Sequence, residues 1–170
     1  MDPSTFVRVE VAPLLPSAGR ALDLAGGAGR HAIWLAERGW DTTMVDTSEV
    51  AIGIAEERAA EANVDISFVH ADLTVDDPPT GPWDLVLIVH YLQRDLFPNI
   101  VEQLADNGLL AFSVATKRNL ERHERPGLPY VLDEGEAPSL VDGLVIVHYA
   151  EGWSIEDRYE ARLVARRRAS

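Results

Sequence analysis

Glycine and aspartate residues of this 170-residue chain stand where they could bind a nucleoside. Gly26, Gly27 and Gly29 occupy a turn between a short apolar run, residues 21–24, and a segment that begins at Arg30. Glycines let backbone N–H groups approach a ligand and reach dihedral angles that a Cβ forbids. A helix that begins at Arg30 would add unpaired N–H donors and the positive end of its dipole. The pattern therefore predicts a site for a nucleoside-bearing, partly anionic cofactor.

Two aspartates follow further apolar runs. Asp46 comes after residues 42–45, where a carboxylate can accept hydrogen bonds from both hydroxyls of a ribose. Asp72 follows residues 66–70, and we expect its side chain beside an adenine ring. Either aspartate alone could be a strand-end or capping residue, and Asp46 could cap a helix that begins near Ser48. Together with the glycine turn, the two favour a shared adenosine site.

These residues resemble the motifs of the Rossmann-like S-adenosylmethionine-dependent methyltransferases. The resemblance rests on Asp23-Leu24-Ala25-Gly26-Gly27-Ala28-Gly29, on Asp46 and on Ala71-Asp72-Leu73. The chain is most similar to the small tellurite-resistance-type group, in which Gly-Arg-His or Gly-Arg-Asn enters the first helix. The resemblance covers residues 21–115 well and the remainder more loosely. Ala25 departs from the usual glycine, and Asp106-Asn107-Gly108 replaces a Pro-Gly-Gly turn.

The resemblance implies S-adenosylmethionine as the cofactor and a set of residues that contact it. That set comprises Asp23, Ala25, Gly26, Gly27, Gly29, Arg30, Asp46, Thr47, Ala71, Asp72, Leu73, Val89 and His90. It also places the acceptor near the end of the fourth strand, so we expect His90, Tyr91 and Arg94 to be catalytic. His90 could instead be a half-buried, hydrogen-bonded histidine. An acid or base is needed only where the acceptor carries a proton.

The predicted function is methyl transfer from S-adenosylmethionine to a small molecule. The tellurite-type resemblance implies an oxyanion or chalcogen acceptor by analogy. One alternative is an NAD(P)-binding oxidoreductase, because Gly27, Gly29 and Ala32 match the dinucleotide spacing and Asp46 lies at nearly the expected distance. A second alternative is a non-catalytic regulatory protein that binds S-adenosylmethionine. The acidic strand position Asp23 and the second nucleoside contact favour the methyltransferase.

Composition restricts the partners. The formal net charge is −13, with 28 acidic and 15 basic residues, which disfavours nucleic acid and anionic membranes. No apolar run has the length of a membrane span. The absence of cysteine excludes a thiol nucleophile and a thiolate metal site, and no metal site is predicted. The N-terminus shows no secretion signal, so we expect a cytoplasmic protein. We expect it to be a monomer or a homodimer.

Periodicity predicts one α/β domain over residues 1–170, with a doubly wound, mostly parallel seven-stranded sheet and helices on both faces. Predicted strands cover residues 21–24, 42–45, 66–69, 84–89, 109–115, 144–149 and 161–166, the last two forming an antiparallel pair. Predicted helices cover residues 4–15, 30–38, 49–62 and 95–105, and residues 1–20 form a cover segment. Residues 116–136 are a possible lid, with basic groups at Lys117, Arg118, Arg122, His123 and Arg125.

Overall fold

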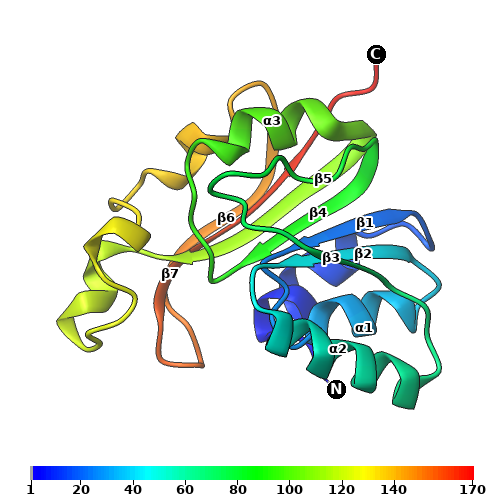
Figure 1. The fold of residues 1–170 in the computed structure, drawn as a ribbon. Helices are drawn as coiled ribbons and strands as arrows, with labels where there is room; N and C mark the ends of the chain where they lie inside the picture. The colour runs from blue at the N-terminus through cyan, green and yellow to red at the C-terminus, as the bar shows by residue number, and fades with distance from the viewer. Residues whose placement is uncertain (1) are drawn as a thin grey trace.

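The computed structural model describes residues 2–170 and contains one seven-stranded sheet (Figure 1). The strand order is β3-β2-β1-β4-β5-β7-β6, and the pairs are parallel from β3 to β5 and antiparallel at β5–β7 and β7–β6. The strands are β1 (Arg20–Leu24), β2 (Asp41–Asp46), β3 (Ser67–His70), β4 (Trp83–Val89), β5 (Leu104–Ala115), β6 (Val145–Trp153) and β7 (Tyr159–Arg166). The predicted fold class is confirmed, including the antiparallel C-terminal pair.

Alternate residues of the central strands build two cores on opposite faces of the sheet. One face carries α3 (Leu96–Gln103), and the other carries α1 (Arg30–Ala36) together with the N-terminal segment (Figure 1). Along β4, Val86 and Ile88 pack toward α3, whereas Leu85 and Leu87 pack toward α1. Both faces are buried, which explains why β4 is apolar from Leu85 to Val89 rather than alternating. Helices therefore cover both faces, as predicted.

The helix after β2 follows its sequence signals closely. Helix α2 spans Glu49–Ala62, which are the predicted bounds, and Ser48 caps it by accepting a hydrogen bond from the Ala51 N–H (3.2 Å). The helix ends at Asn63, whose φ of +55° is a left-handed conformation that asparagine tolerates. No helix of the described chain, residues 2–170, is long and apolar enough to cross a membrane.

Two predicted helices differ in the structure. The N-terminal segment is helical over residues 5–14, close to the predicted 4–15, but it contains a π-helix, η1 (Val7–Val11), followed by a 3-10 turn, η2 (Ala12–Leu14), rather than one continuous α-helix. The helix predicted over residues 95–105 spans only Leu96–Gln103, because Leu104 pairs with Trp83 and so begins β5. The predicted turn at residues 106–108 is an irregularity inside β5, with a φ of +63° at Asn107. Strand pairing overrides helix periodicity at this point.

Residues 116–136, called the arm below, extend beyond the carboxyl ends of β4 and β5 (Figure 1). The arm contains two 3-10 turns, η3 (Lys117–Glu121) and η4 (Leu128–Tyr130), and is followed by η5 (Ala137–Val141). It returns to the sheet where the Lys117 N–H donates to the Leu132 carbonyl (2.8 Å) and the Leu132 N–H donates to the Ala115 carbonyl (2.9 Å). The predicted loop is therefore ordered by backbone hydrogen bonds at its base.

Candidate active site at the carboxyl ends of the strands

The three glycines of the β1–α1 turn have different physical roles. A Cβ added at Gly26 would lie 2.4 Å from Met44 Cγ, and one at Gly29 would lie 2.8 Å from Ala55 Cβ. These two glycines allow the turn to pack against β2 and α2. A Cβ at Gly27 would meet no atom within 4 Å, although the φ of +58° still favours glycine. Of the three glycines, only Gly27 has open space on the side where a Cβ would lie.

Asp46 connects the turn to the end of β2. The Gly27 N–H donates to Asp46 Oδ2 (2.8 Å), and the Ser48 N–H donates to Asp46 Oδ1 (2.9 Å). The Asp46 carbonyl accepts from the Ala71 N–H (3.1 Å), which brings the exit of β3 beside it. Each carboxylate oxygen has more than one lone pair, so both can still accept a ribose hydroxyl. Asp46 can therefore accept these local backbone hydrogen bonds and a ligand's hydroxyl groups at the same time.

Asp23 is a buried carboxylate directly beneath the turn. Its residue is 1 % exposed, and Oδ2 has no hydrogen-bond partner among the described residues. Burial raises the pKa of Asp23 to about 7, and the nearby charge of Asp46 contributes in the same direction. An orphaned acceptor at this position favours a ligand that brings positive charge to the turn.

The third aspartate lies in the loop after β3. The Thr74 hydroxyl (2.6 Å) and the Thr74 N–H (2.9 Å) both donate to Asp72 Oδ1, and these bonds hold the pKa of Asp72 below its usual range. Nearby, the Tyr91 hydroxyl donates to Gln93 (2.6 Å), whose amide donates to the Leu73 carbonyl (2.8 Å). Burial, followed by the charge of Asp72, raises the pKa of Tyr91. The loops after β3 and β4 therefore meet beside Asp72.

A cavity of about 270 Å³ opens beside the turn. Its lining comprises Ala25, Gly26, Gly27, Ala28, Arg30, His31, Arg58, Val89 and His90. His31 is 4 % exposed, and its Nε2 accepts a hydrogen bond from the Ser4 N–H (3.3 Å). Burial lowers the pKa of His31 to about 3, with Arg30 adding to the effect, so the imidazole is neutral near pH 7. The structure thus brings six of the predicted cofactor contacts to one cavity.

His90 leaves the end of β4 in an uncommon backbone conformation. Its φ is +61°, and its N–H donates to the Ser113 carbonyl on β5 (2.8 Å). Its Nε2 lies 3.3 Å from Oε2 of Glu160, a residue of β7 that is 2 % exposed. Left-handed backbone outside glycine concentrates at functional sites, where the surrounding structure holds it. The ring is therefore fixed between the cavity and the start of β7.

Residues 21–108, just over half of the chain, match the methyltransferase domain family. The chain belongs to this family. The match covers the glycine turn and the three aspartates together with β4, and S-adenosylmethionine is the cofactor of this class of domain. The family match therefore decides between the two cofactors considered, S-adenosylmethionine and a nicotinamide dinucleotide, in favour of S-adenosylmethionine.

Individual relatives agree with this assignment. YqeM, a candidate methyltransferase of Bacillus subtilis (strain 168), is 32% identical over 109 residues, which are 59% of this chain and 44% of YqeM. The chain thus spans less than half the length of the curated relatives it matches. TehB from Haemophilus influenzae has a similar fold, with a TM-score of 0.79 at 20% identity over 94% of this chain and 61% of TehB. The N-methyltransferase NodS from Bradyrhizobium japonicum WM9 gives a TM-score of 0.73 at 22% identity, over 99% of both chains.

The side chain of Arg94 forms hydrogen bonds with the arm and does not line the cavity at the glycine turn. Its guanidinium forms two hydrogen bonds with Glu136 (2.5 and 2.9 Å) and one with the Val131 carbonyl (3.0 Å). Glu136 raises the pKa of Arg94, and Arg94 in turn lowers that of Glu136. This bidentate pair joins the segment before α3 to the end of the arm. Arg94 was predicted to be catalytic together with His90, but only His90 lines the cavity at the glycine turn.

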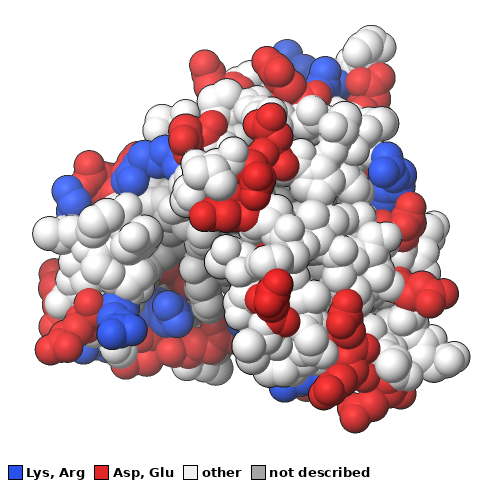
Figure 2. Space-filling model, in the orientation of Figure 1, with Lys and Arg blue, Asp and Glu red and all other residues white. Residues whose placement is uncertain are grey.

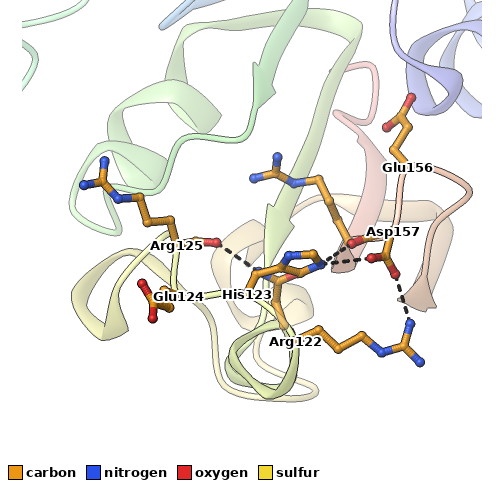
Figure 3. A pocket seen from close by; sticks show the side chains of 8 residues that line it. Arg122, His123, Glu124, Arg125, Glu156 and Asp157 are labelled. Atoms are coloured by element: carbon orange, nitrogen blue, oxygen red, sulfur yellow. Dashed lines mark hydrogen bonds and ion pairs between the residues drawn. The ribbon is translucent and has the colours of Figure 1, made fainter.

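Four of the five basic groups of the arm, all except Arg125, are paired with acids among the described residues. Lys117 contacts Asp133, and Arg118 lies 3.8 Å from Glu121 and 4.0 Å from Glu134. Figure 3 shows Arg122 and His123 both directed at Asp157, with Nη1–Oδ1 and Nε2–Oδ2 distances of 2.9 and 3.3 Å. Blue and red side chains accordingly alternate over this side of the molecule (Figure 2). The arm presents mixed rather than positive charge.

Several residues of the methyltransferase domain's site escaped sequence analysis. Arg58 reaches the turn from α2 and donates to the Ala28 carbonyl (3.1 Å), whereas Glu160 arrives from β7. Ser4 comes from the N-terminal segment. No local motif marks these residues, because each reaches the site through tertiary packing. The sequence predicted an antiparallel pair over residues 144–149 and 161–166, but not that β7 lies next to β5, which brings Glu160 near the end of β4.

Proposed function

We propose that this methyltransferase domain holds S-adenosylmethionine across the β1–α1 turn and methylates a small molecule at the carboxyl ends of β4 and β5. The observation that carries the proposal is the unpaired, buried Asp23 Oδ2 beneath a turn whose Gly27 backbone is open. S-adenosylmethionine supplies a methyl group already activated by a sulfonium, and its ammonium and sulfonium charges suit the negative potential of Asp23. A nicotinamide dinucleotide would bring a pyrophosphate to the same buried carboxylate and be disfavoured.

The adenosine contacts follow from the same geometry. Asp46 already accepts the Gly27 N–H and would accept the ribose hydroxyls with its remaining lone pairs. Asp72 uses only Oδ1 for Thr74, which leaves Oδ2 for an exocyclic adenine amine. Ala71 bonds to the Asp46 carbonyl and Leu73 to the Gln93 amide, so that Ala71 and Leu73, with Thr47 and Tyr91, would contact the adenosine between the two carboxylates.

The protein's part in the chemistry is alignment, exclusion of water and, where needed, removal of a proton. His90 lines the cavity, and as long as its ring binds no metal ion it can accept a proton from an acceptor while Glu160 compensates the charge. His31 stays neutral and adds no competing positive charge beside the cofactor. Ser4 holds His31 in place, so the N-terminal segment acts as the cover of the cavity.

An oxyanion or chalcogen acceptor is the narrower form of this proposal. The similar fold of TehB supports this acceptor class. The arm does not add support, because most of its cations are paired with acids and provide no positive surface for an anion. The neighbour SpnF, named a [4+2]-cyclase, has a TM-score of 0.76 at 17% identity, so this fold also occurs in a protein named for another reaction. A role without methyl transfer therefore stays as the second candidate. A cytoplasmic location and a monomeric or homodimeric state stay predictions.

Thermal unfolding with added ligands tests the cofactor. S-adenosylhomocysteine at about 100 times its dissociation constant should stabilise the protein by about 2.7 kcal/mol, whereas NADH at equal concentration should not. Stabilisation by NADH that equals or exceeds that by S-adenosylhomocysteine contradicts the proposal. Formation of S-adenosylhomocysteine from S-adenosylmethionine with panels of small acceptors then separates methyl transfer from binding alone.

A further inference from the structure

Three side chains from separate parts of the chain meet beyond the end of β4. His90, Glu156 and Glu160 each offer one ligand atom, and these atoms all lie within 4.8 Å of one another. His90 directly follows β4, Glu160 is near the start of β7, and Glu156 lies in the turn between β6 and β7. An imidazole with two carboxylates is a donor set that suits divalent transition metals such as Zn²⁺ and Mn²⁺.

Glu160 supplies an independent reason to expect a cation. The residue is 2 % exposed, and its Oε2 has no hydrogen-bond partner among residues 2–170. His90 Nε2 is 3.3 Å away but is not aligned for a hydrogen bond with it. A buried carboxylate oxygen without a partner is costly, and a cation placed between it and the imidazole removes that cost.

The charges around the cluster do not balance. None of the ion pairs found between described residues joins Glu156 or Glu160 to a lysine or an arginine. Two carboxylates therefore face a single imidazole. Figure 3 shows Glu156 pointing away from Arg122, His123 and Asp157, on the far side of its turn. A divalent cation would neutralise the pair.

One ligand separation and one supporting contact fit a metal, and all three ligand atoms lie within 4.8 Å of one another. Bonds of about 2.0–2.2 Å in a tetrahedral site separate two ligand atoms by roughly 3.3–3.6 Å, and the His90–Glu160 separation of 3.3 Å falls in this range. Glu156 Oε1 accepts a hydrogen bond from the Thr5 N–H (3.2 Å), which orients the carboxylate as outer-shell bonds do at metal sites. The left-handed φ of His90 fixes the third ligand.

We propose that His90, Glu156 and Glu160 form a binding site for one divalent transition-metal ion beside the cavity at the glycine turn. Three protein ligands leave a tetrahedral ion with one open position, as in catalytic zinc sites. His90 also lines that cavity, so the open position would hold an oxygen-bearing acceptor next to the methyl donor. The metal binding itself stands on the three side chains alone, and only this placement of the acceptor rests on the proposed function.

Calorimetric titration of the metal-free protein with Zn²⁺ and Mn²⁺ tests the site. We expect one equivalent of at least one ion to bind in wild type. Glu160→Gln and Glu156→Gln should each weaken binding roughly tenfold or more, because losing a ligand costs at least as much as losing an outer-shell partner. Glu124→Gln removes an exposed acid outside the cluster and should leave the affinity unchanged.

Thermal unfolding without metal shows that each variant is folded, and Glu156→Gln keeps the test decisive if the buried Glu160→Gln does not fold. No saturable binding of either ion to wild type, or equal affinity in wild type and Glu156→Gln, overturns the proposal. Binding of S-adenosylhomocysteine to the metal-free wild type is measured in parallel. If that binding is intact while metal binding fails, only the metal site is wrong.

Discussion

Two halves of the molecule beyond the strand ends, the glycine turn and the arm of residues 116–136, use their charged groups in different ways. Around the turn, Asp23 and Asp46 lie beside the proposed ligand position, and Oδ2 of Asp23 has no hydrogen-bond partner among the described residues. Along the arm, basic side chains are matched by acids of the same region, as Lys117 is by Asp133. The first half keeps charge for a ligand, whereas the second uses charge mainly to hold its own shape. Each prediction below tests one side of this contrast.

The largest effect is expected at Asp23, whose buried carboxyl has a pKa raised from 3.8 to about 7. The folded state therefore binds a proton that the unfolded state has lost, and stability falls as pH rises between these two values. Asp23→Asn does not titrate, so its stability relative to wild type should increase by about 3 kcal/mol from pH 5 to pH 8. Chemical denaturation at both pH values measures the difference. A difference that is independent of pH would place Asp23 in a solvated, ordinary environment.

Asp46 should give the next effect, on binding rather than on folding. Asp46→Ala removes the acceptor for the ribose hydroxyls and should weaken S-adenosylhomocysteine by about 2–3 kcal/mol, the scale for charged hydrogen bonds. Asp77→Ala, at an exposed position after β3, is the matched control and should bind as wild type does. Calorimetry on proteins of confirmed fold supplies both affinities.

The turn could shift when Asp46 no longer accepts the Gly27 N–H, so Asp46→Asn is the second variant. It keeps a side-chain acceptor and the size of the side chain while removing the charge. Unchanged affinity in both folded variants would reduce Asp46 to a helix cap.

His31 should show the opposite pH dependence to Asp23. Its pKa falls from 6.5 to about 3 on burial, so the unfolded state binds the extra proton between these values. The stability that His31 contributes is present above pH 6.5 and is lost as pH falls toward 3. From pH 7 to pH 5, wild type should lose about 2 kcal/mol more than His31→Gln. Equal losses in the two proteins would mean that the ring is hydrated in the folded state.

The contrast also explains what sequence analysis predicted well. The turn, α2 with its Ser48 cap and the positions of Asp46 and Asp72 depend on neighbours within a few residues, so local patterns predict them. Sequence analysis assigned all three glycines to ligand binding and did not predict that Gly26 and Gly29 allow packing against Met44 of β2 and Ala55 of α2.

The arm and β7 depend on contacts between distant segments, which periodicity does not report. Sequence analysis noted the basic groups of the arm but not their acidic partners, one of which is Asp157, far along the chain. Arg94 was placed at the cavity from its position after β4, yet Glu136 draws it to the arm. The pairing of His90 with Glu160 likewise required the antiparallel return of β7.

The smallest effect is expected at Arg118, which tests whether the arm's charges act on an acceptor. Its guanidinium lies 3.8 Å from Glu121 and 4.0 Å from Glu134, and it stacks over the Tyr159 ring at 5.1 Å. All three side chains of the ion pairs are substantially exposed, so Arg118→Ala should lower stability by less than about 1 kcal/mol. Turnover with any accepted small molecule should stay close to that of wild type, because the charge serves the arm itself. Chemical denaturation of the variant measures the change in stability, and steady-state kinetics measures the turnover. A KM that rises about tenfold with unchanged folding would show that Arg118 binds the acceptor, and the contrast between the two halves would then fail at this residue.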